Sequence, residues 1–166
     1  MDKMDRLDKV ALRNLILAQL KADRDLLLQA ASAAHAAATH AENIPDSKYE
    51  TLSIEASYIA QGQANRAQEI SLAMESFRQL DPKNFTPHDP IRLGALVLLE
   101  DEDGHQRLIL LGPAAGGLKL SFPQGEIMVI TPDSPLGENL LGRQVGDVVE
   151  LAVAGRLREY EILTIS

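Results

Sequence analysis

The stretch VITPDSPLGENLLGRQVGDVVEL, residues Val129–Leu151, decides the fold of the C-terminal part of this chain. Pro132 and Asp133 predict the end of a strand, since proline cannot donate to a sheet ladder. Ser134 is a favoured N-cap residue, and Pro135 at the first helical position removes an N–H that has no partner within the helix. A strand, a tight turn and a short helix are therefore expected here in close succession.

The segment LGENLL that follows predicts a helix of two turns. Gly142 can adopt the left-handed conformation that commonly ends a helix, and GRQVGD then predicts a turn into the next strand. The side chains expected to point from this helix into a sheet are those of Leu136, Leu140 and Leu141.

Short apolar runs with the period of a β-strand lie on both sides of this helix. Two pairs of runs predict hairpins, one across DEDGHQ and one across Ala154-Gly155. Together these runs predict a compact α+β domain, with roughly six strands in a twisted antiparallel sheet and the helix across one face. The runs are IRLGALVLLE, RLILLGP, LKLSFP, EIMVITP, VVELAV and LREYEILTI.

Residues 1–80 have a different periodicity and consist mostly of good helix formers. Apolar residues recur there at spacings of three and four, which is typical of a coiled coil. Pro45 stops one helix, and Asp46 or Ser47 can cap the next. The expected seam residues are Leu12, Ile16, Leu20, Leu27, Ala31, Ala34, Ala38 and Ala41, then Leu52, Ala56, Ile59, Gln63, Arg66, Ile70, Met74 and Phe77.

Such a stripe also suits the core of a larger helical bundle, but its narrow apolar face favours an antiparallel two-helix hairpin. The segment LDPKNFTPHDP cannot continue a helix because it holds three prolines. We therefore predict a two-domain α+β chain: a coiled-coil hairpin over residues 1–80 with its tip near 42–50, a linker over 81–90, and a sheet domain over 91–166.

Composition excludes several classes of function. The formal net charge is −8, and an acidic chain is repelled by DNA and by anionic membranes, so we expect no strong direct nucleic-acid binding. There is no Cys, which removes disulfides and Cys-ligated zinc. The opening residues DKMDRLDK are charged, so we expect no signal peptide there, and no apolar run is long enough to span a membrane. We expect a cytoplasmic protein.

No sequence pattern predicts catalysis by the chain itself. GPAAGGLKLS lacks the Gly-Lys-Ser/Thr of a phosphate loop, and EDEDGH lacks the spacing of a calcium loop and is expected to be a hairpin turn. His35 and His40 are five residues apart and do not share a helix face. We therefore expect no intrinsic catalytic residue and no cofactor of the protein's own.

The motif TPDSPLGENLLGRQVGDVVEL, followed by REYEILTI, resembles the C-terminal domain of the bacterial GreA/GreB transcript cleavage factors. The resemblance implies an FKBP-like C-terminal domain behind an N-terminal antiparallel coiled coil. It also implies a factor that binds bacterial RNA polymerase and inserts its coiled coil into the secondary channel. In the family, acidic tip residues help to hold a second Mg²⁺ at the polymerase active site, and the polymerase then cleaves backtracked RNA.

The tip differs from the family pattern Gly-Asp-Leu-x-Glu-Asn-Ala-Glu-Tyr. Aligning NRAQEI with the family's Arg-x-x-Glu-Ile places Asp46 on the family Asp, but Tyr49 on the family Glu, with Glu50 one residue later. One residue is about 100° of helical rotation, so Glu50 points elsewhere unless the tip turn differs. Asp46, Glu50 and Glu42 are the acidic tip candidates, with Asp46 as the candidate metal ligand shared with the polymerase.

The resemblance also implies that the surface around SPLGENLLGRQ faces the polymerase, with Leu136, Gly137, Arg143 and Gln144 as candidate contacts. We predict a factor that modulates elongation or pausing, and is at most an accessory to the polymerase's own cleavage activity. Two alternatives stay open at this point. One is a coiled-coil interaction or scaffold module unrelated to polymerase, and the other is an inhibitory competitor of true cleavage factors.

Overall fold

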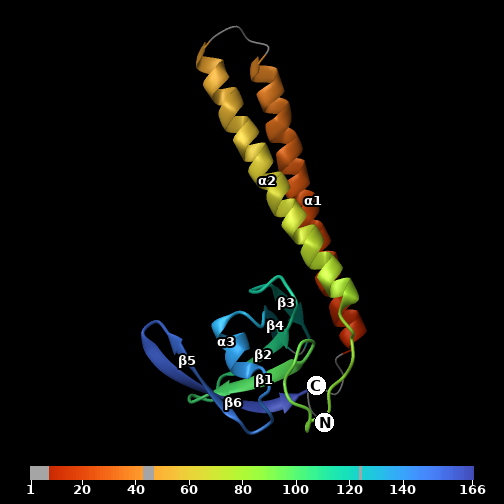
Figure 1. The fold of residues 1–166 in the computed structure, drawn as a ribbon, viewed down its shortest axis with the longest axis vertical. Coiled ribbons are helices and arrows are strands. Elements are labelled where there is room, and N and C mark those ends of the chain that lie inside the picture. The colour runs from red at the N-terminus through yellow and green to blue at the C-terminus, as the bar shows by residue number, and fades with distance from the viewer. Residues whose placement is uncertain (1–7, 43–46, 124) are drawn as a thin grey trace. The chain divides into compact units, whose positions relative to one another are not determined.

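The computed structural model describes residues 8–42, 47–123 and 125–166 (Figure 1). By their contacts the residues divide into two compact units, Met1–Ile16 with Ser76–Ser166, and Leu17–Glu75. The boundaries of these units fall within the two long helices described next. The predicted domain limits at residues 80 and 90 stay a prediction. None of the helices in the described ranges is long and apolar enough to cross a membrane.

Two long helices make up the N-terminal half, α1 over Lys9–Glu42 and α2 over Ser47–Gln79. They run side by side in opposite directions in Figure 1. Ser53 Oγ donates a hydrogen bond of 3.1 Å to the backbone oxygen of Ala38, so the two backbones approach closely there. The predicted antiparallel hairpin is confirmed. Pro45, which the sequence predicts to end the first helix, lies outside the described residues.

The seam on α1 follows the prediction as far as Ala38, but the predicted seam on α2 is wrong at three positions. Leu52 and Ile59 are 50% and 56% exposed, and Arg66 is also exposed. Their places are taken by the small residues Ser53, Ala60 and Ala67, each one position later, which let the helices pack closely. The observed seam is Ser53, Ala56, Ala60, Gln63, Ala67, Ile70, Met74 and Phe77.

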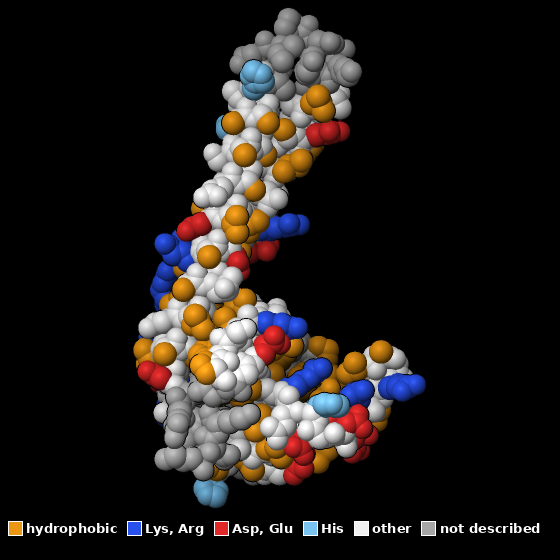
Figure 2. Space-filling view, turned by 180° about the vertical axis from the view of Figure 1, so that it is seen from behind, with side chains coloured by type: hydrophobic (Ala, Val, Ile, Leu, Met, Phe, Trp, Pro, Cys, Tyr) orange, Lys and Arg blue, Asp and Glu red, His pale blue; other side chains and the backbone are white. Residues whose placement is uncertain are grey.

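The large apolar residues left outside this seam stay on the surface of the helices. Figure 2 shows apolar side chains exposed along the helices among charged ones. The most exposed of them are Leu26, Ile54, Tyr58, Ile59 and Leu72, at 56% or more.

The C-terminal half is a single six-stranded sheet with one short helix, as the fold prediction required. The strand order is β3-β4-β2-β1-β6-β5. The strands are β1 Leu96–Asp101, β2 Gln106–Leu111, β3 Lys119–Phe122, β4 Gly125–Ile130, β5 Val148–Val153 and β6 Arg156–Ile165, and the helix is α3, Pro135–Leu140. Both predicted hairpins, β1–β2 and β5–β6, are present.

One strand pairing differs from the expected antiparallel sheet, because β2 and β4 pair in parallel while the other pairs are antiparallel. The cause is the segment between β2 and β3, which turns the chain so that the β3–β4 hairpin returns beside β2. Gly112 opens this segment, and an added Cβ there would lie 2.8 Å from Val129 and 3.1 Å from Phe77. The sheet is therefore mixed.

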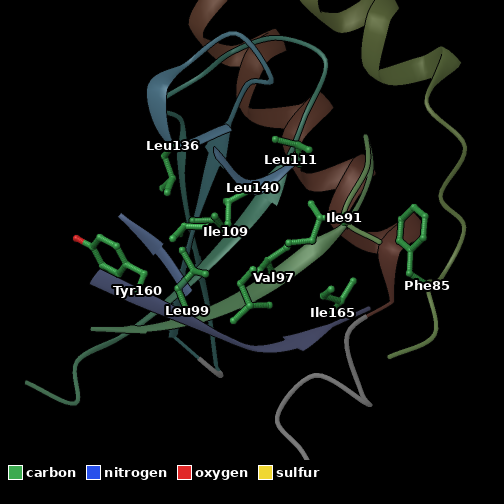
Figure 3. Packing of buried hydrophobic residues seen from close by; sticks show 13 residues of the cluster. Phe85, Ile91, Val97, Leu99, Ile109, Leu111, Leu136, Leu140, Tyr160 and Ile165 are labelled. Atoms are coloured by element: carbon green, nitrogen blue, oxygen red, sulfur yellow. The ribbon is translucent and has the colours of Figure 1, made fainter. Parts of the chain in front are cut away.

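The main core lies between the sheet and α3 (Figure 3). Leu140 of α3 lies beside Ile109 of β2 in this view. Tyr160 of β6 closes one end of the core and is 2% exposed. The fully buried members include Val97, Leu99, Leu111, Leu140 and Ile162.

A buried lysine fixes the start of α1 within the first unit. Lys9 is 6% exposed, and its Nζ donates to the backbone oxygens of Gly94 at 2.7 Å and Lys83 at 2.9 Å. The ammonium also lies 4.4 Å from the ring centroid of Phe85. Burial lowers the pKa of Lys9 to about 8. The first turn of α1 is thereby tied to the proline-rich segment, whose residues 81–90 form no helix or strand.

Candidate functional site

Helix α3 begins with the cap that the sequence predicts. Ser134 Oγ accepts a hydrogen bond of 3.1 Å from the N–H of Gly137 and donates one of 2.7 Å to the backbone oxygen of Thr131. Pro135 occupies the first position of the helix. The Ser-Pro pair therefore ties the start of α3 to the end of the preceding strand, and α3 has a defined position on the sheet.

Two of the four predicted partner contacts face the interior. Leu136 is 7% exposed and belongs to the core cluster. Gly137 is buried, and a Cβ added to it would lie 2.0 Å from the backbone oxygen of Thr131. Both residues hold α3 against the sheet, so the surface-accessible part of the predicted set is Arg143 and Gln144.

The end of α3 differs from the prediction at one leucine. Gly142 has φ of 79°, the left-handed conformation expected of it. Leu141, predicted to point into the sheet, is instead 42% exposed. It is the C-cap residue with φ of −54° and ψ of 127°, so the backbone leaves the helix there and the side chain turns away from the core.

The turn after α3 is held by backbone hydrogen bonds on both sides. Ile91 N–H donates to Arg143 O at 2.8 Å, and Gly142 N–H donates to Ile91 O at 2.8 Å. The Gln144 N–H donates to the Asp147 carboxylate at 2.8 Å. These bonds fix the backbone that carries Arg143 and Gln144, so the surface there is preorganised.

Five exposed residues on and after this turn form a surface that we call the α3 rim. Its members are Leu141, Arg143, Gln144, Val145 and Val148, and its apolar members are 39% to 50% exposed. Arg143 Nε donates to Asn139 O at 3.2 Å. Arg143 and Val148 also line an open hollow of about 650 Å³ with Asn139 and Glu150.

Sequence reasoning missed three members of the α3 rim. Leu141 was expected to be buried. Val145 and Val148 lie in GRQVGDVVEL. The adjacent pair Val148-Val149 does not by itself indicate which of the two side chains points outward. The alternation with Glu150 is the signal that could have identified Val148, since residues two apart on a strand share a face.

The predicted acidic tip is only partly visible. Asp46 lies outside the described residues, and so does the side chain of Glu42, the last residue of α1. Glu50 lies in the first turn of α2 and is exposed. A carboxylate at this end of a helix is favoured by the helix dipole.

The DEDGHQ turn brings together the one group of metal-capable side chains found among the described residues, Asp101, Asp103 and His105. Asp101 accepts hydrogen bonds of 2.9 Å from the N–H groups of Asp103 and His105, and lies 3.3 Å from Arg158. Burial acts to raise the pKa of Asp101, but these backbone hydrogen bonds and His105 outweigh it and lower that pKa. The carboxylate stabilises the predicted hairpin turn, and its negative charge is balanced by Arg158.

Comparisons with known proteins match the C-terminal half most clearly. Residues 86–166 match the family model described as transcription elongation factor, GreA/GreB, C-term. The chain is 30% identical over 100 residues to the transcription elongation factor GreA of Alkalilimnicola ehrlichii, covering 60% of each chain. It is 26% identical over 98 residues to GreA of Neorickettsia sennetsu, covering 59% of this chain and 58% of that one.

The chain spans about 60% of the length of these curated relatives. Among solved structures, the GreA factor homolog 1 of Thermus thermophilus is similar over 93% of this chain and 94% of its own, with 21% identity and a TM-score of 0.37.

Proposed function

We propose that this chain, which is a divergent member of the GreA/GreB family through its C-terminal domain, is a transcription factor that binds bacterial RNA polymerase. In this proposal the helical hairpin acts through the secondary channel of the polymerase, and the factor modulates elongation or pausing. It is an accessory protein and carries out no reaction of its own. The cytoplasmic location that we predict from the sequence is the one that this role requires.

The α3 rim is the observation that supports docking most directly. It joins three exposed apolar side chains to an arginine on a backbone that is fixed by hydrogen bonds. Arginine and apolar side chains on a rigid surface are frequent anchors of protein interfaces. A preorganised surface also loses little conformational entropy on binding.

The docking proposal predicts that Arg143→Glu weakens binding to core RNA polymerase about tenfold, because a rim cation is replaced by a charge that its partner site repels. The measurement is the dissociation constant of the full chain for core polymerase. Arg156→Glu, an equal charge change at the first residue of β6, is the matched control and should bind like the unchanged chain. Equal binding by the Arg143 variant would remove the α3 rim from the interface.

The described tip residues do not by themselves make a magnesium site. Glu50 is an exposed carboxylate, and no group of three metal-capable side chains includes it within the described ranges. Carboxylates bind Mg²⁺ in small numbers together with waters and substrate phosphates. Any Mg²⁺ near the tip would therefore be held jointly with the polymerase, through Asp46 in the expected alignment.

We propose that the factor stimulates transcript cleavage weakly or not at all while it still binds polymerase. The supporting observation is the order Tyr49-Glu50 where the family pattern has Glu-Asn. The assay is a stalled, backtracked elongation complex to which the full chain is added. Robust cleavage that disappears in both Asp46→Ala and Glu50→Ala would show a competent tip and contradict this proposal.

The same tip favours a second candidate function, inhibition by competition. A factor that occupies the channel without supporting cleavage would slow cleavage driven by a true cleavage factor in the same assay. If the chain does not bind core polymerase at all, the scaffold alternative replaces both proposals.

A further inference from the structure

An open hollow of about 570 Å³ lies in the first unit, apart from the α3 rim. The end of α2, the proline-rich segment and the residues before β1 line it. Its apolar lining includes Leu80, Phe85 and Leu93, and Leu93 is 42% exposed. Its charged lining includes Asp81, Lys83 and Arg92. We call it the Phe85 hollow.

Cations gather around Phe85 although the chain as a whole is strongly acidic. The Arg92 guanidinium lies 5.1 Å from the ring centroid and the Lys9 ammonium 4.4 Å from it. Such contacts hold cations over an aromatic face. Lys9 is buried and bonded to two carbonyls, whereas Lys83 and Arg92 are exposed at the hollow.

These two exposed cations have no ion pair with any carboxylate in the described part of the chain. Asp81 lines the hollow, and Asp89 lies close enough for Arg92 and Lys83 to lower its pKa, after the larger effect of the Thr86 hydrogen bonds. Two cations, Lys83 and Arg92, thus line the hollow with one carboxylate, Asp81. In a chain of net charge −8 this is a local excess of positive charge.

We propose that the Phe85 hollow is a second docking site, which takes an acidic segment of the polymerase through a carboxylate next to an apolar side chain. The carboxylate lies between Lys83 and Arg92, and the apolar side chain packs on Leu93 and the edge of Phe85. This inference rests on the proposed function, since it names the chemistry of a second contact with the same partner.

The charges and the aromatic geometry favour a protein segment over a nucleic acid. A stacking platform needs a free aromatic face, but two cations already lie over the Phe85 ring, which is 9% exposed. The net charge of the chain repels a phosphodiester backbone over any extended length. A short acidic and apolar segment matches both the charge and the apolar lining of the hollow.

The test measures the dissociation constant of the full chain for core RNA polymerase at several salt concentrations. We expect the double variant Lys83→Glu, Arg92→Glu to bind about tenfold more weakly, with a shallower dependence on salt. The double variant Arg107→Glu, Arg156→Glu has the same net charge and changes neither this hollow nor the α3 rim, and it should bind normally. Both hollow residues are exposed, so any loss of stability should be limited to the contact of Arg92 with the Phe85 ring, and thermal unfolding checks that the variant is folded.

A second measurement identifies the occupant. A photo-reactive phenylalanine analogue replaces the exposed Leu93, and crosslinked peptides are mapped by mass spectrometry in the complex with core polymerase. We expect a polymerase peptide with Asp or Glu beside an apolar residue. Crosslinks to nucleic acid, to a second copy of this chain or to nothing would overturn the proposal.

Normal polymerase binding by the Lys83, Arg92 variant would overturn the second site and leave the proposed function standing. No binding by the unchanged chain would instead overturn the proposed function, and the second site with it.

Discussion

Gly137→Ala is expected to destabilise the C-terminal domain by about 3 kcal/mol, because overpacking against fixed atoms reaches the upper end of measured mutational effects. The added Cβ would lie 2.0 Å from the backbone oxygen of Thr131 and 3.0 Å from Ser134 Oγ. A backbone atom cannot rotate away, so α3 has to move and the Ser134 cap is disturbed. Urea denaturation of the full chain, followed by the NMR signals of the buried residues Val97 and Ile162, measures the loss.

Gly142→Ala at the other end of α3 is the matched control. Nothing lies within 4 Å of its added Cβ, but its φ of 79° disfavours a side chain, so we expect a loss of only about 1 kcal/mol. Equal losses in the two variants would contradict the prediction, because they would mean that a small shift of α3 relieves the contact with Thr131 at little cost.

The free energy of unfolding should rise by about 3 kcal/mol between pH 8 and pH 10.5 because of Lys9 alone, at about 1.4 kcal/mol for each unit of pKa difference. Burial lowers the pKa of Lys9 from 10.5 to about 8 in the folded chain. The unfolded chain therefore binds more protons in this range, and raising the pH favours the folded state. The neutral amine keeps two N–H groups for the carbonyls of Gly94 and Lys83.

The measurement compares the unchanged chain with Lys9→Met at several pH values, so that the other titrating groups cancel. Methionine fills a similar space and does not titrate. The free energy of unfolding of the unchanged chain should rise relative to that of Lys9→Met as the pH rises. A difference that stays constant from pH 7.5 to pH 10 would show that the carbonyls and Phe85 keep Lys9 protonated in the fold.

The local elements of the C-terminal half could be predicted because each has a short-range cause. The Ser134 cap, Pro135 at the first helical position and Gly142 at the helix end are all where the sequence places them. Both hairpins could be predicted from the alternating apolar runs, because turn residues and the two-residue period of a strand depend only on neighbours in the chain.

Features set by distant contacts could not be predicted. The seam of α2 lies at Ser53 and Ala60 and not at Leu52 and Ile59 because α1 approaches closely. The distance between two helices cannot be predicted from the periodicity of one of them. The parallel pairing of β2 with β4 depends on the path of the loop at Gly112. The exposure of Leu141 follows from one backbone angle at the helix end, so part of the α3 rim was missed.

The seam of the helical hairpin also sets where the hairpin opens first. Toward one end the buried seam side chains are Leu20 and Met74, and toward the other they are Ala38 and Ser53. Each buried methylene contributes about 0.8 kcal/mol, so resistance to local unfolding falls along the helices toward Ala38 and Ser53. We therefore expect the backbone amides near Ala38 and Ser53 to exchange hydrogen with solvent quickly, through local fraying. The amides near Leu20 should exchange more slowly, because they require a larger and rarer opening of the hairpin.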